Sequence, residues 1–438
     1  MTIKKPGWVN MTIDDIKATP KGSLVSGPFG SNISAKYFTE DGVPVIRGNN
    51  LTLGKKAFVD SGFVFISEEK AYELRNCEAI PGDIIFTAAG TLGQVGLIPS
   101  DGSYPKYIVS NKQLRLRCNE EIAVPEYLYY YFSAPSIRTY IANQNTGSSV
   151  PLLTLGILKR VPVALPPLPI QKKIASILSA YDDLIENNNR RIKILEEMAQ
   201  NIYREWFVHF RYPGHENVPM VDSELGQIPQ GWEVKKLGDI AEVVDCLHSK
   251  KPSEEVDEAK RYGILLNVWN IEEGGRLDLS KKYFINKDDY ELWTSRVEVR
   301  EGDCVVTNVG RIGAVAQIPV SVKAAIGRNM TSIRCTSTTI TPTYLIEYLL
   351  SPHMKSEVQK KSDPGTIMGS LNVRGIVRLN VPIPTPDIIS RFEKTVRPIR
   401  LRMESLVQQN QNLRKTRDLL LPKLISGQLD VEELDIKV

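Results

Sequence analysis

The sequence contains one pattern twice, and this constrains its fold more than any other feature. The segment GDIIFTAAGTLGQVGLIP at 82–99 returns as GDCVVTNVGRIGAVAQIP at 302–319, an offset of 220 residues (302 − 82). Shorter matches flank it in the same order: Gly7-Trp8 with Gly231-Trp232, Asn50 with Asn270, Asn111 with Asn329, and Tyr127-Leu128 with Tyr344-Leu345. Such a repeat predicts two similar folded units. Two related but unlike units in one chain suit an asymmetric ligand.

Composition narrows the class of protein. A chain of 438 residues is long enough for two globular domains. Its net charge of +4 permits nucleic-acid binding without requiring it. The sequence has no apolar run of membrane-spanning length and its first residues, MTIKKPGWVNM, lack a signal core, so we expect neither a membrane association nor export. Five cysteines without a CxxC pair favour the cytoplasm and argue against a structural metal site.

The first copy reads as mixed structure followed by a long helix. Short β-rich runs broken by Gly, Asn, Asp and Pro fill residues 8 to 165. PEYLYYYFSAPSIRTYIANQ predicts a helix from Pro125, with its tyrosine run in the core. ALPPLP at 164–169 then ends the globular part and starts a helix over roughly 170–210. The Pro- and Gly-rich segment 211–232 predicts an extended linker to the second copy.

Both copies end in a heptad pattern. Alternate steps of four and three give two seams: Ile174, Leu178, Tyr181, Ile185, Asn188, Ile192, Leu195, Ala199, Ile202, Trp206, and Phe392, Val396, Ile399, Met403, Leu406, Asn410, Leu413, Arg417, Leu420, Leu424. A sustained period of 3.5 is typical of coiled coils.

The two seams predict an antiparallel pair with a defined register. Antiparallel pairing sets Asn188 opposite Asn410, whereas parallel pairing sets Asn188 against Leu406 and leaves its amide unsatisfied. A polar pair inside an apolar seam fixes register. Helices of about 40 residues span roughly 60 Å, so we expect a rigid rod with the globular units at its ends, related by a pseudo-twofold axis.

Several motifs, in this order, resemble those of one family. They are SGPFGSNI at 26–33, GVPVIRGNNL at 42–51, the two GD hairpins, the central helix beginning VPVALPPLPIQKKIASI at 161–177, LGQIPQGWEVKKLGDI at 225–240, and LLLPKLISGQLD at 419–430. Over nearly its whole length the chain resembles the DNA-specificity (HsdS, or S) subunit of type I restriction–modification systems. The start of the second helix, PTPDIISRFEKT at 384–395, departs from the family pattern.

The resemblance implies an α+β fold with two target-recognition domains separated by a long antiparallel coiled coil. We expect recognition domains at residues 1–167 and 231–384, the central helix at 168–212, a linker at 213–230, and the C-terminal helix and tail at 385–438. Each domain would read half of a bipartite, asymmetric site in double-stranded DNA.

The resemblance also implies partners. The coiled coil would set the spacing of the half-sites and dock two methyltransferase (M) subunits, which methylate adenine N6 with S-adenosylmethionine. Restriction (R) subunits, using ATP and Mg²⁺, would cleave unmodified DNA. This chain itself would bind no cofactor or metal and would have no catalytic residues.

The hairpin tips are the first candidates for DNA contact. They differ between the copies, with Thr91 and Gln94 in one and Arg311 and Ala314 in the other, so the two units are predicted to read different bases. Arginine reads guanine or binds phosphate. The neighbouring glycines are predicted to serve the turns.

Other candidates lie on polar loops. In the first copy they are Ser31, Arg47, Asn49, Asn50, Lys55, Lys56 and Ser148, and in the second Asn267, Asn270, Arg328 and Asn329. Asparagine can pair with adenine and lysine with phosphate. The plainer alternatives are a solvated loop for the lysines, a helix entry for Ser148, and a loop anchored by Phe29 around Ser31.

Two other classes of function remain open. An interaction scaffold would use the coiled coil without reading DNA, and the small net charge supports it. A methyltransferase acting alone is disfavoured, because the only Pro-Pro, Pro166-Pro167, lacks the flanking residues of an amino-methyltransferase motif. The sequence also has no GxxxxGK[ST] phosphate loop, which argues against ATP hydrolysis.

Overall fold

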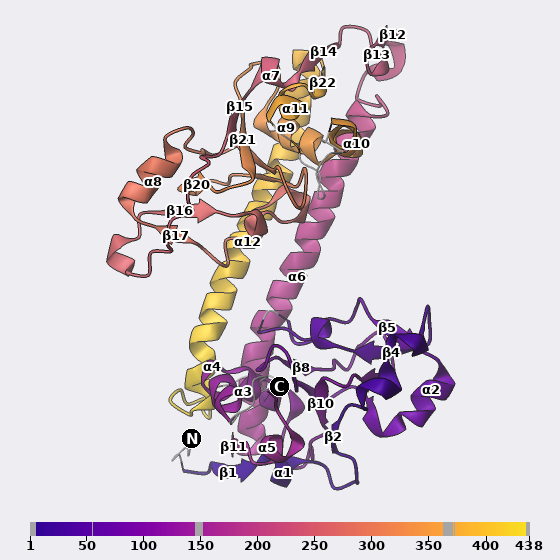
Figure 1. Ribbon diagram of the computed structural model, residues 1–438, viewed down its shortest axis with the longest axis vertical. Helices are drawn as coiled ribbons and strands as arrows, with labels where there is room; N and C mark the ends of the chain where they lie inside the picture. Colours follow the sequence, from indigo (N-terminus) through magenta and orange to yellow (C-terminus); the bar gives the residue numbers. More distant parts are fainter. Residues whose placement is uncertain (1–5, 55, 145–151, 362–370, 372, 435–438) are drawn as a thin grey trace. The chain divides into compact units, whose positions relative to one another are not determined.

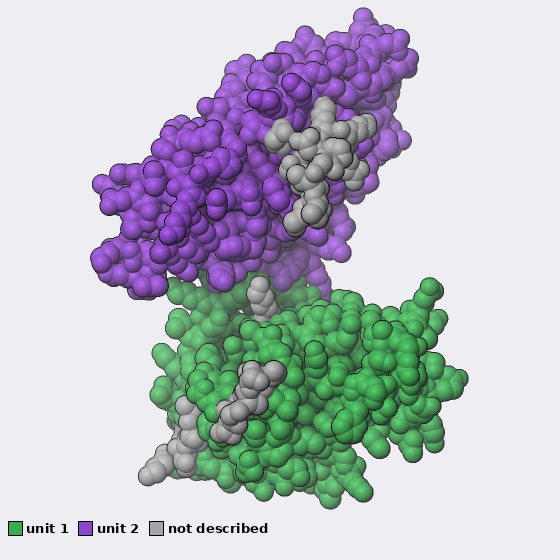
Figure 2. Space-filling view, in the orientation of Figure 1, with its two compact units in different colours: residues 1–186, 412–438 green, residues 187–411 purple. Residues whose placement is uncertain are grey.

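The computed structural model describes residues 6–54, 56–144, 152–361, 371 and 373–434. The chain divides into two compact units, one of residues 1–186 and 412–438 (unit 1) and one of residues 187–411 (unit 2) (Figure 2). Both are α+β, and each takes a part of both long helices (Figure 1).

The described residues of unit 1 form three sheets. The four-stranded sheet has the order β2 (Leu24–Ser26), β10 (Gln113–Leu116), β7 (Ile84–Thr87), β8 (Val95–Leu97). The five-stranded sheet has the order β3 (Phe38–Thr39), β5 (Val64–Ile66), β4 (Val43–Ile46), β9 (Tyr107–Val109), β6 (Glu78–Ala79). β1 (Val9–Thr12) pairs with β11 (Pro162–Leu165). The short helices are α1 (Ile13–Ile16), α2 (Glu68–Glu73), α3 (Pro125–Ser133), α4 (Pro135–Asn143) and α5 (Leu155–Lys159).

Unit 2 repeats this plan. Its four-stranded sheet has the order β15 (Ala241–Asp245), β21 (Met330–Cys335), β18 (Cys304–Thr307), β19 (Val315–Gln317), and a second sheet has β17 (Phe284–Ile285), β16 (Gly263–Leu266), β20 (Ala324–Ile326). β14 (Glu233–Lys236) pairs with β22 (Asn380–Ile383). The short helices are α7 (Leu237–Ile240), α8 (Lys287–Thr294), α9 (Pro342–Leu350), α10 (Pro352–Lys361) and α11 (Val373–Val377).

The repeated Gly-Asp has the same structural role in both units. Asp83 is buried, accepts a hydrogen bond from the Ile80 amide at 2.9 Å, and binds the Arg117 guanidinium through both oxygens at 2.8 Å. In unit 2, Asp303 accepts from the Arg300 amide at 2.8 Å and binds Arg334. A buried carboxylate requires such partners, so this part of the repeat is a requirement of folding.

The long helices are α6 (Leu168–Phe207) and α12 (Pro386–Ile425). Within unit 1, Ile174 and Leu178 of α6 join one core with Leu421 and Leu424 of α12. Within unit 2, the Asn188 side-chain amide donates to Asn410 Oδ1 at 2.9 Å, and both side chains are buried. The antiparallel pairing expected from the seams is therefore confirmed.

Two expectations about local structure were wrong. The segment expected as an extended linker contains an antiparallel hairpin of β12 (Met220–Ser223) and β13 (Gly226–Pro229), with Ile228 buried in the core of unit 2. The helix expected from Pro125 is two helices, because Pro135 disfavours a helical backbone at Ala134, which has ψ 136°. The tyrosines of α3 are buried, as expected. In the part of the chain that is described, no helix has the length and apolarity to cross a membrane.

Candidate functional site

A parallel pair of strands gathers polar loops at one edge of unit 1. β4 runs parallel to β9, with Val45 beside Ile108 and Ile46 beside Val109. The carboxyl ends of parallel strands meet at the same edge of a sheet, so the chain leaves β4 at Arg47 and β9 at Ser110 side by side. The hairpin between β7 and β8 approaches the same edge, because β10 begins three residues after Ser110 and pairs with β7.

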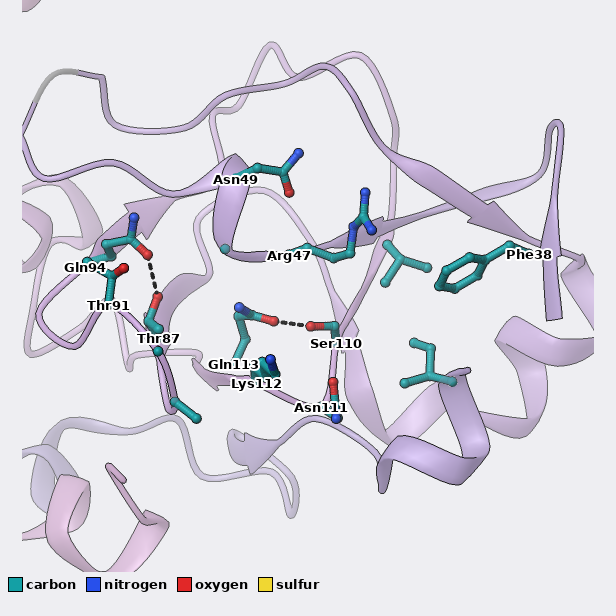
Figure 3. Close-up of a pocket in the computed structure, with 15 residues that line it drawn as sticks. Phe38, Arg47, Asn49, Thr87, Thr91, Gln94, Ser110, Asn111, Lys112 and Gln113 are labelled. Atoms are coloured by element: carbon teal, nitrogen blue, oxygen red, sulfur yellow. Dashed lines mark hydrogen bonds between the residues drawn. The ribbon is translucent and has the colours of Figure 1, made fainter. Parts of the chain in front are cut away.

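These loops enclose a pocket of about 560 Å³ (Figure 3). It is lined by Ile33, Phe38, Val45, Arg47, Gly48, Asn49, Thr87, Ala89, Gly90, Thr91, Gln94, Ser110, Asn111, Lys112 and Gln113. The pocket thus brings together four of the predicted DNA contacts: Arg47, Asn49, Thr91 and Gln94.

Some of these polar groups are already bonded within the unit. Thr87 Oγ1 donates to Gln94 Oε1 at 3.0 Å, and the Gln94 amide donates to the Leu51 carbonyl at 3.1 Å. A hydrogen bond also joins Ser110 Oγ to the Gln113 side chain (Figure 3). Such bonds fix the orientation of the donors and acceptors that the pocket presents.

Other groups remain available to a ligand. Thr91, Asn111 and Lys112 are exposed at the pocket. Asn49 is exposed there too, although its amide nitrogen donates to the Gly62 carbonyl at 3.3 Å and its oxygen is the atom that it offers to a ligand. The half-buried Arg47 has a buried Nε for which no hydrogen-bond partner is found in the described structure. Two cationic side chains among amides and hydroxyls suit an anionic ligand with hydrogen-bonding edges, such as nucleic acid.

Asn50 and Asn270 are structural, so the expectation that they contact DNA is corrected. Asn50 is buried, accepts from the Arg47 amide at 2.9 Å, and donates to the carbonyls of Val59 and Ser61 at 2.9 and 3.0 Å. Asn270 makes the equivalent bonds in unit 2, accepting from Asn267 and donating to Asp278 and Lys281. Their side chains are fully used in closing a loop, which explains why both copies have asparagine there.

Unit 2 builds the equivalent edge from different residues. β16 and β20 form its parallel pair, with Leu266 beside Ile326. Arg328 and Asn329, in the turn after β20, are exposed, and Asn329 has φ +65°. Asn267, by contrast, is buried and donates to the Leu265 carbonyl at 2.9 Å, so its predicted DNA contact is also corrected.

Arg311 is exposed at the second hairpin tip but is partly engaged. Its guanidinium donates to the Ile271 carbonyl at 2.8 Å. It lines a pocket of about 870 Å³ that also includes four glutamates, Glu196, Glu197, Glu272 and Glu273. Lys193 and Lys355 also line this pocket, and Glu196 and Glu272 are paired with Arg276, so the charges around Arg311 are mixed and do not distinguish a phosphate contact from a base contact.

The remaining candidates lie apart from the pocket lining. Ser31 is exposed on the 3₁₀ turn Gly30–Ile33. Lys56 is exposed, with its ammonium 3.4 Å from Glu186. Lys55 and Ser148 lie outside the described residues. The pocket residues that sequence reasoning missed are Ser110, Asn111, Lys112 and Gln113. The repeat itself offered a signal, since Lys112 takes the structural place of Asn329, which was chosen in the second copy.

One group of potential metal ligands lies in unit 2. The ligand atoms of Asp245, Cys246 and His248 are within 4.8 Å of one another, and His248 Nε2 is 2.8 Å from Asp245 Oδ2. Burial raises the pKa of the Cys246 thiol, which favours its neutral form. A metal would have to displace that proton and the bond between histidine and aspartate, so the geometry favours a structural hydrogen bond.

Comparisons with known proteins agree with this architecture. Residues 7–197 match the model of the type I restriction modification DNA specificity domain. The MjaIX specificity subunit of Methanocaldococcus jannaschii is 28% identical over 98% of this chain and 94% of its own length. The HindI specificity subunit of Haemophilus influenzae is 22% identical over 85% of this chain and 94% of its own.

A solved structure supports the fold. The S subunit of a type I restriction–modification system from M. genitalium aligns with a TM-score of 0.55 at 14% identity, covering 97% of this chain and 99% of that one. The repeated unit, the paired helices and these similarities agree: over nearly its whole length the chain is similar to type I restriction enzyme specificity subunits, and residues 7–197 match the DNA specificity domain of that family.

Proposed function

We propose that each unit reads one half of a bipartite, asymmetric DNA site, and that the chain directs adenine N6 methylation by partner subunits to that site. The observation that supports this most directly is the difference between equivalent positions. Thr91, Asn49 and Lys112 of unit 1 correspond to Arg311, Trp269 and Asn329 of unit 2. The loops share a scaffold but present different chemistry, as a protein that reads two unlike half-sites requires.

In this proposal the chain supplies specificity and its partners supply chemistry. Two methyltransferase subunits would dock on the coiled coil and use S-adenosylmethionine, and restriction subunits with ATP and Mg²⁺ would cleave unmodified DNA in the cytoplasm. The chain would hold no cofactor of its own. The residues of unit 1 would then bind and orient DNA: Lys112 and Arg47 at phosphates, and Thr91, Asn49 and Asn111 at base edges.

The test is methylome sequencing of a host that carries this gene with its partner genes, compared with a deletion of this gene alone. The proposal expects one gapped, asymmetric N6-methyladenine motif that disappears with the deletion. Replacing Thr91, Asn49 and Lys112 together should then alter one half of the motif and leave the other half unchanged. A methylome that is unaffected by the deletion, from a strain with active methyltransferase subunits, contradicts the proposal and favours a scaffold.

A further inference from the structure

The aromatic ring of Phe29 is exposed, although the sequence suggested that it anchors its loop. Its exposed fraction is 84%, while Ile33, four residues on, is 6% exposed and belongs to the core of the five-stranded sheet. Ile33 therefore anchors the loop and the phenylalanine ring is left in solvent. Single exposed apolar side chains are common, so the exposure needs a second observation before it suggests a function.

That observation is the way the loop is held against the pocket. The Gly27 amide donates to the Gln113 carbonyl at 2.9 Å, and a Cβ at Gly27 would lie 1.8 Å from the Ser110 carbonyl oxygen. A Cβ at Gly30 would lie 3.0 Å from the Asn111 side-chain nitrogen. The backbone on both sides of Phe29 is thus packed against Ser110 and Asn111, which line the pocket. Ile33 lines it too, so Phe29 is fixed at the pocket rim.

The other exposed aromatic rings differ from Phe29 in their surroundings. Tyr72, Tyr262 and Trp269 each lie beneath a cation, namely Arg75 at 4.7 Å, Lys323 at 3.4 Å and Lys251 at 4.8 Å from the ring centroid. Within the described part of the chain, no ring or cation contact is found for Phe29. Its faces are therefore open to a ligand that offers another flat surface.

We propose that Phe29 inserts its ring against the bases of the half-site bound by unit 1, stacking at a partly unstacked base step. This inference rests on the proposed function and adds a residue that none of the polar candidates supplies. Apolar side chains inserted in this way are used by DNA-binding proteins to deform the duplex. A neutral ring cannot hydrogen-bond to a base edge, so it discriminates base steps by how easily they unstack. It therefore contributes to specificity without a phosphate contact.

The test uses the full-length chain with its methyltransferase partners and two fluorescent duplexes, one with the methylated motif and one with that half-site scrambled. Phe29→Ala should weaken binding of the motif duplex by roughly 5- to 150-fold, the range for loss of base–aromatic stacking. The slope of log affinity against log salt should be unchanged, because no phosphate contact is lost. Phe29→Trp should retain binding. When this variant binds a motif duplex labelled with 2-aminopurine, the fluorescence should depend on the position of the label in the half-site.

Tyr72→Ala is the matched control, since it removes an aromatic ring that is 71% exposed in the same unit, and it should leave both affinities unchanged. If the wild-type complex binds the motif and Phe29→Ala binds equally well, this inference fails while the proposed function stands. If the wild-type complex shows no preference for the motif duplex, the proposed function itself fails. Loss of the methyltransferase subunits from the Phe29→Ala complex would instead make the ring a protein contact and overturn the inference.

Discussion

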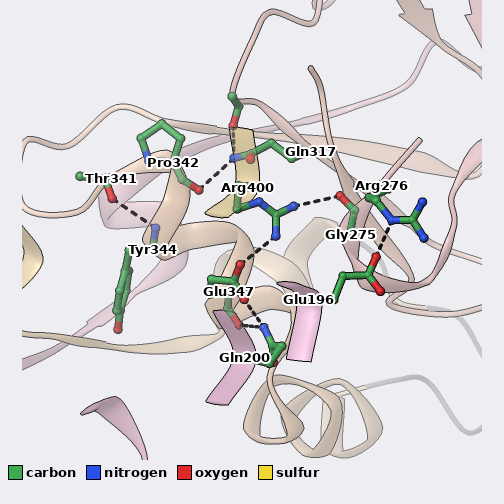
Figure 4. Close-up of polar contacts among 11 residues, drawn as sticks. Glu196, Gln200, Gly275, Arg276, Gln317, Thr341, Pro342, Tyr344, Glu347 and Arg400 are labelled. Atoms are coloured by element: carbon green, nitrogen blue, oxygen red, sulfur yellow. Dashed lines mark hydrogen bonds and ion pairs between the residues drawn. The ribbon is translucent and has the colours of Figure 1, made fainter. Parts of the chain in front are cut away.

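Asp182 and Arg400 occupy the same position of the internal repeat, 218 residues apart (400 − 182), yet they carry opposite charges. In unit 1, the Tyr130 hydroxyl donates to Asp182 at 2.7 Å. In unit 2, Arg400 donates to Glu347 at 2.8 Å, and Glu347 matches Tyr130 in the repeat (Figure 4). Each unit therefore joins its globular part to its own helix pair by a different polar contact.

The contact in unit 2 is a buried ion pair, which makes its removal costly. The Arg400 and Glu347 side chains are 8% and 0% exposed. We predict that Glu347→Gln lowers the unfolding free energy of unit 2 by about 3–5 kcal/mol, because a buried cation loses its partner. Urea unfolding measures this. Glu347→Gln combined with Arg400→Met should recover most of the loss, since it leaves no unpaired charge.

An exposed pair on the same helix is the control for this prediction. Arg391 and Asp387 are joined at 2.9 Å and are 51% and 64% exposed. Exposed pairs contribute roughly 0–1 kcal/mol, so Asp387→Asn should change stability little. An effect of Glu347→Gln as small as that of Asp387→Asn would contradict the structural role given to the buried pair.

The register of the helix pair can be tested through Asn188 and Asn410. We predict that Asn188→Leu destabilises unit 2, because Asn410 Oδ1 loses its donor. The Asn410 side-chain amide keeps its hydrogen bond to Asn189 Oδ1 at 2.9 Å. A double-mutant cycle with Asn410→Leu should show a coupling of about 0.5–1.5 kcal/mol. The exposed Asn187 is the control, and Asn187→Leu should show no coupling to Asn410→Leu. Additive effects of the Asn188 and Asn410 substitutions would exclude this register.

A buried thiol predicts a loss of stability at alkaline pH. Burial raises the pKa of Cys118 from its usual value near 9.0 to about 12. The folded state favours the neutral thiol, so this contribution to the unfolding free energy is complete below pH 9 and is lost as pH rises from about 9 to 12. Cys118→Ala removes the ionisation, so its unfolding free energy should fall less steeply over that window. Urea unfolding at pH 8, 9.5 and 10.5 measures the slope.

Leu116→Ala, in the same core, provides the comparison for the thiol. It removes apolar contacts without changing a titratable group, so it should lower stability by the same amount at each pH. If Cys118→Ala also shifts stability equally at all three pH values, the thiol does not titrate differently in the folded and unfolded states.

Much of the fold follows from local sequence patterns. The heptad period identified both long helices and the Asn188–Asn410 pair, because that period directly encodes which side chains face a partner helix. The repeated Gly-Asp identified the two equivalent hairpins, because both units bind the buried aspartate to an arginine in the same way. The positive φ angles of Gly90 and Gly310 agree with the predicted turns.

The candidate site was harder to predict because non-local pairing creates it. Lys112 reaches the pocket only because β4 lies parallel to β9, and no local pattern specifies that neighbour. Asn50 has a side chain that could contact DNA, but tertiary structure decides whether its amide faces a base or closes its own loop. Phe29 and Ile33 illustrate the same difficulty, since both are apolar and only the packed loop decides which one is buried.

The final prediction concerns the cation at the pocket. Lys112 is exposed and lines the pocket, and we expect it to bind a phosphate. Lys112→Ala should weaken binding of the motif duplex and the scrambled duplex to a similar degree, and it should reduce the salt slope by about one. Lys106→Ala is the matched control in unit 1, because Lys106 is paired with Glu68 at 2.7 Å outside the pocket lining. Fluorescence anisotropy at several salt concentrations separates the two variants. An unchanged slope with weaker binding of the motif duplex alone would instead assign Lys112 to a base edge, where it would contribute to specificity.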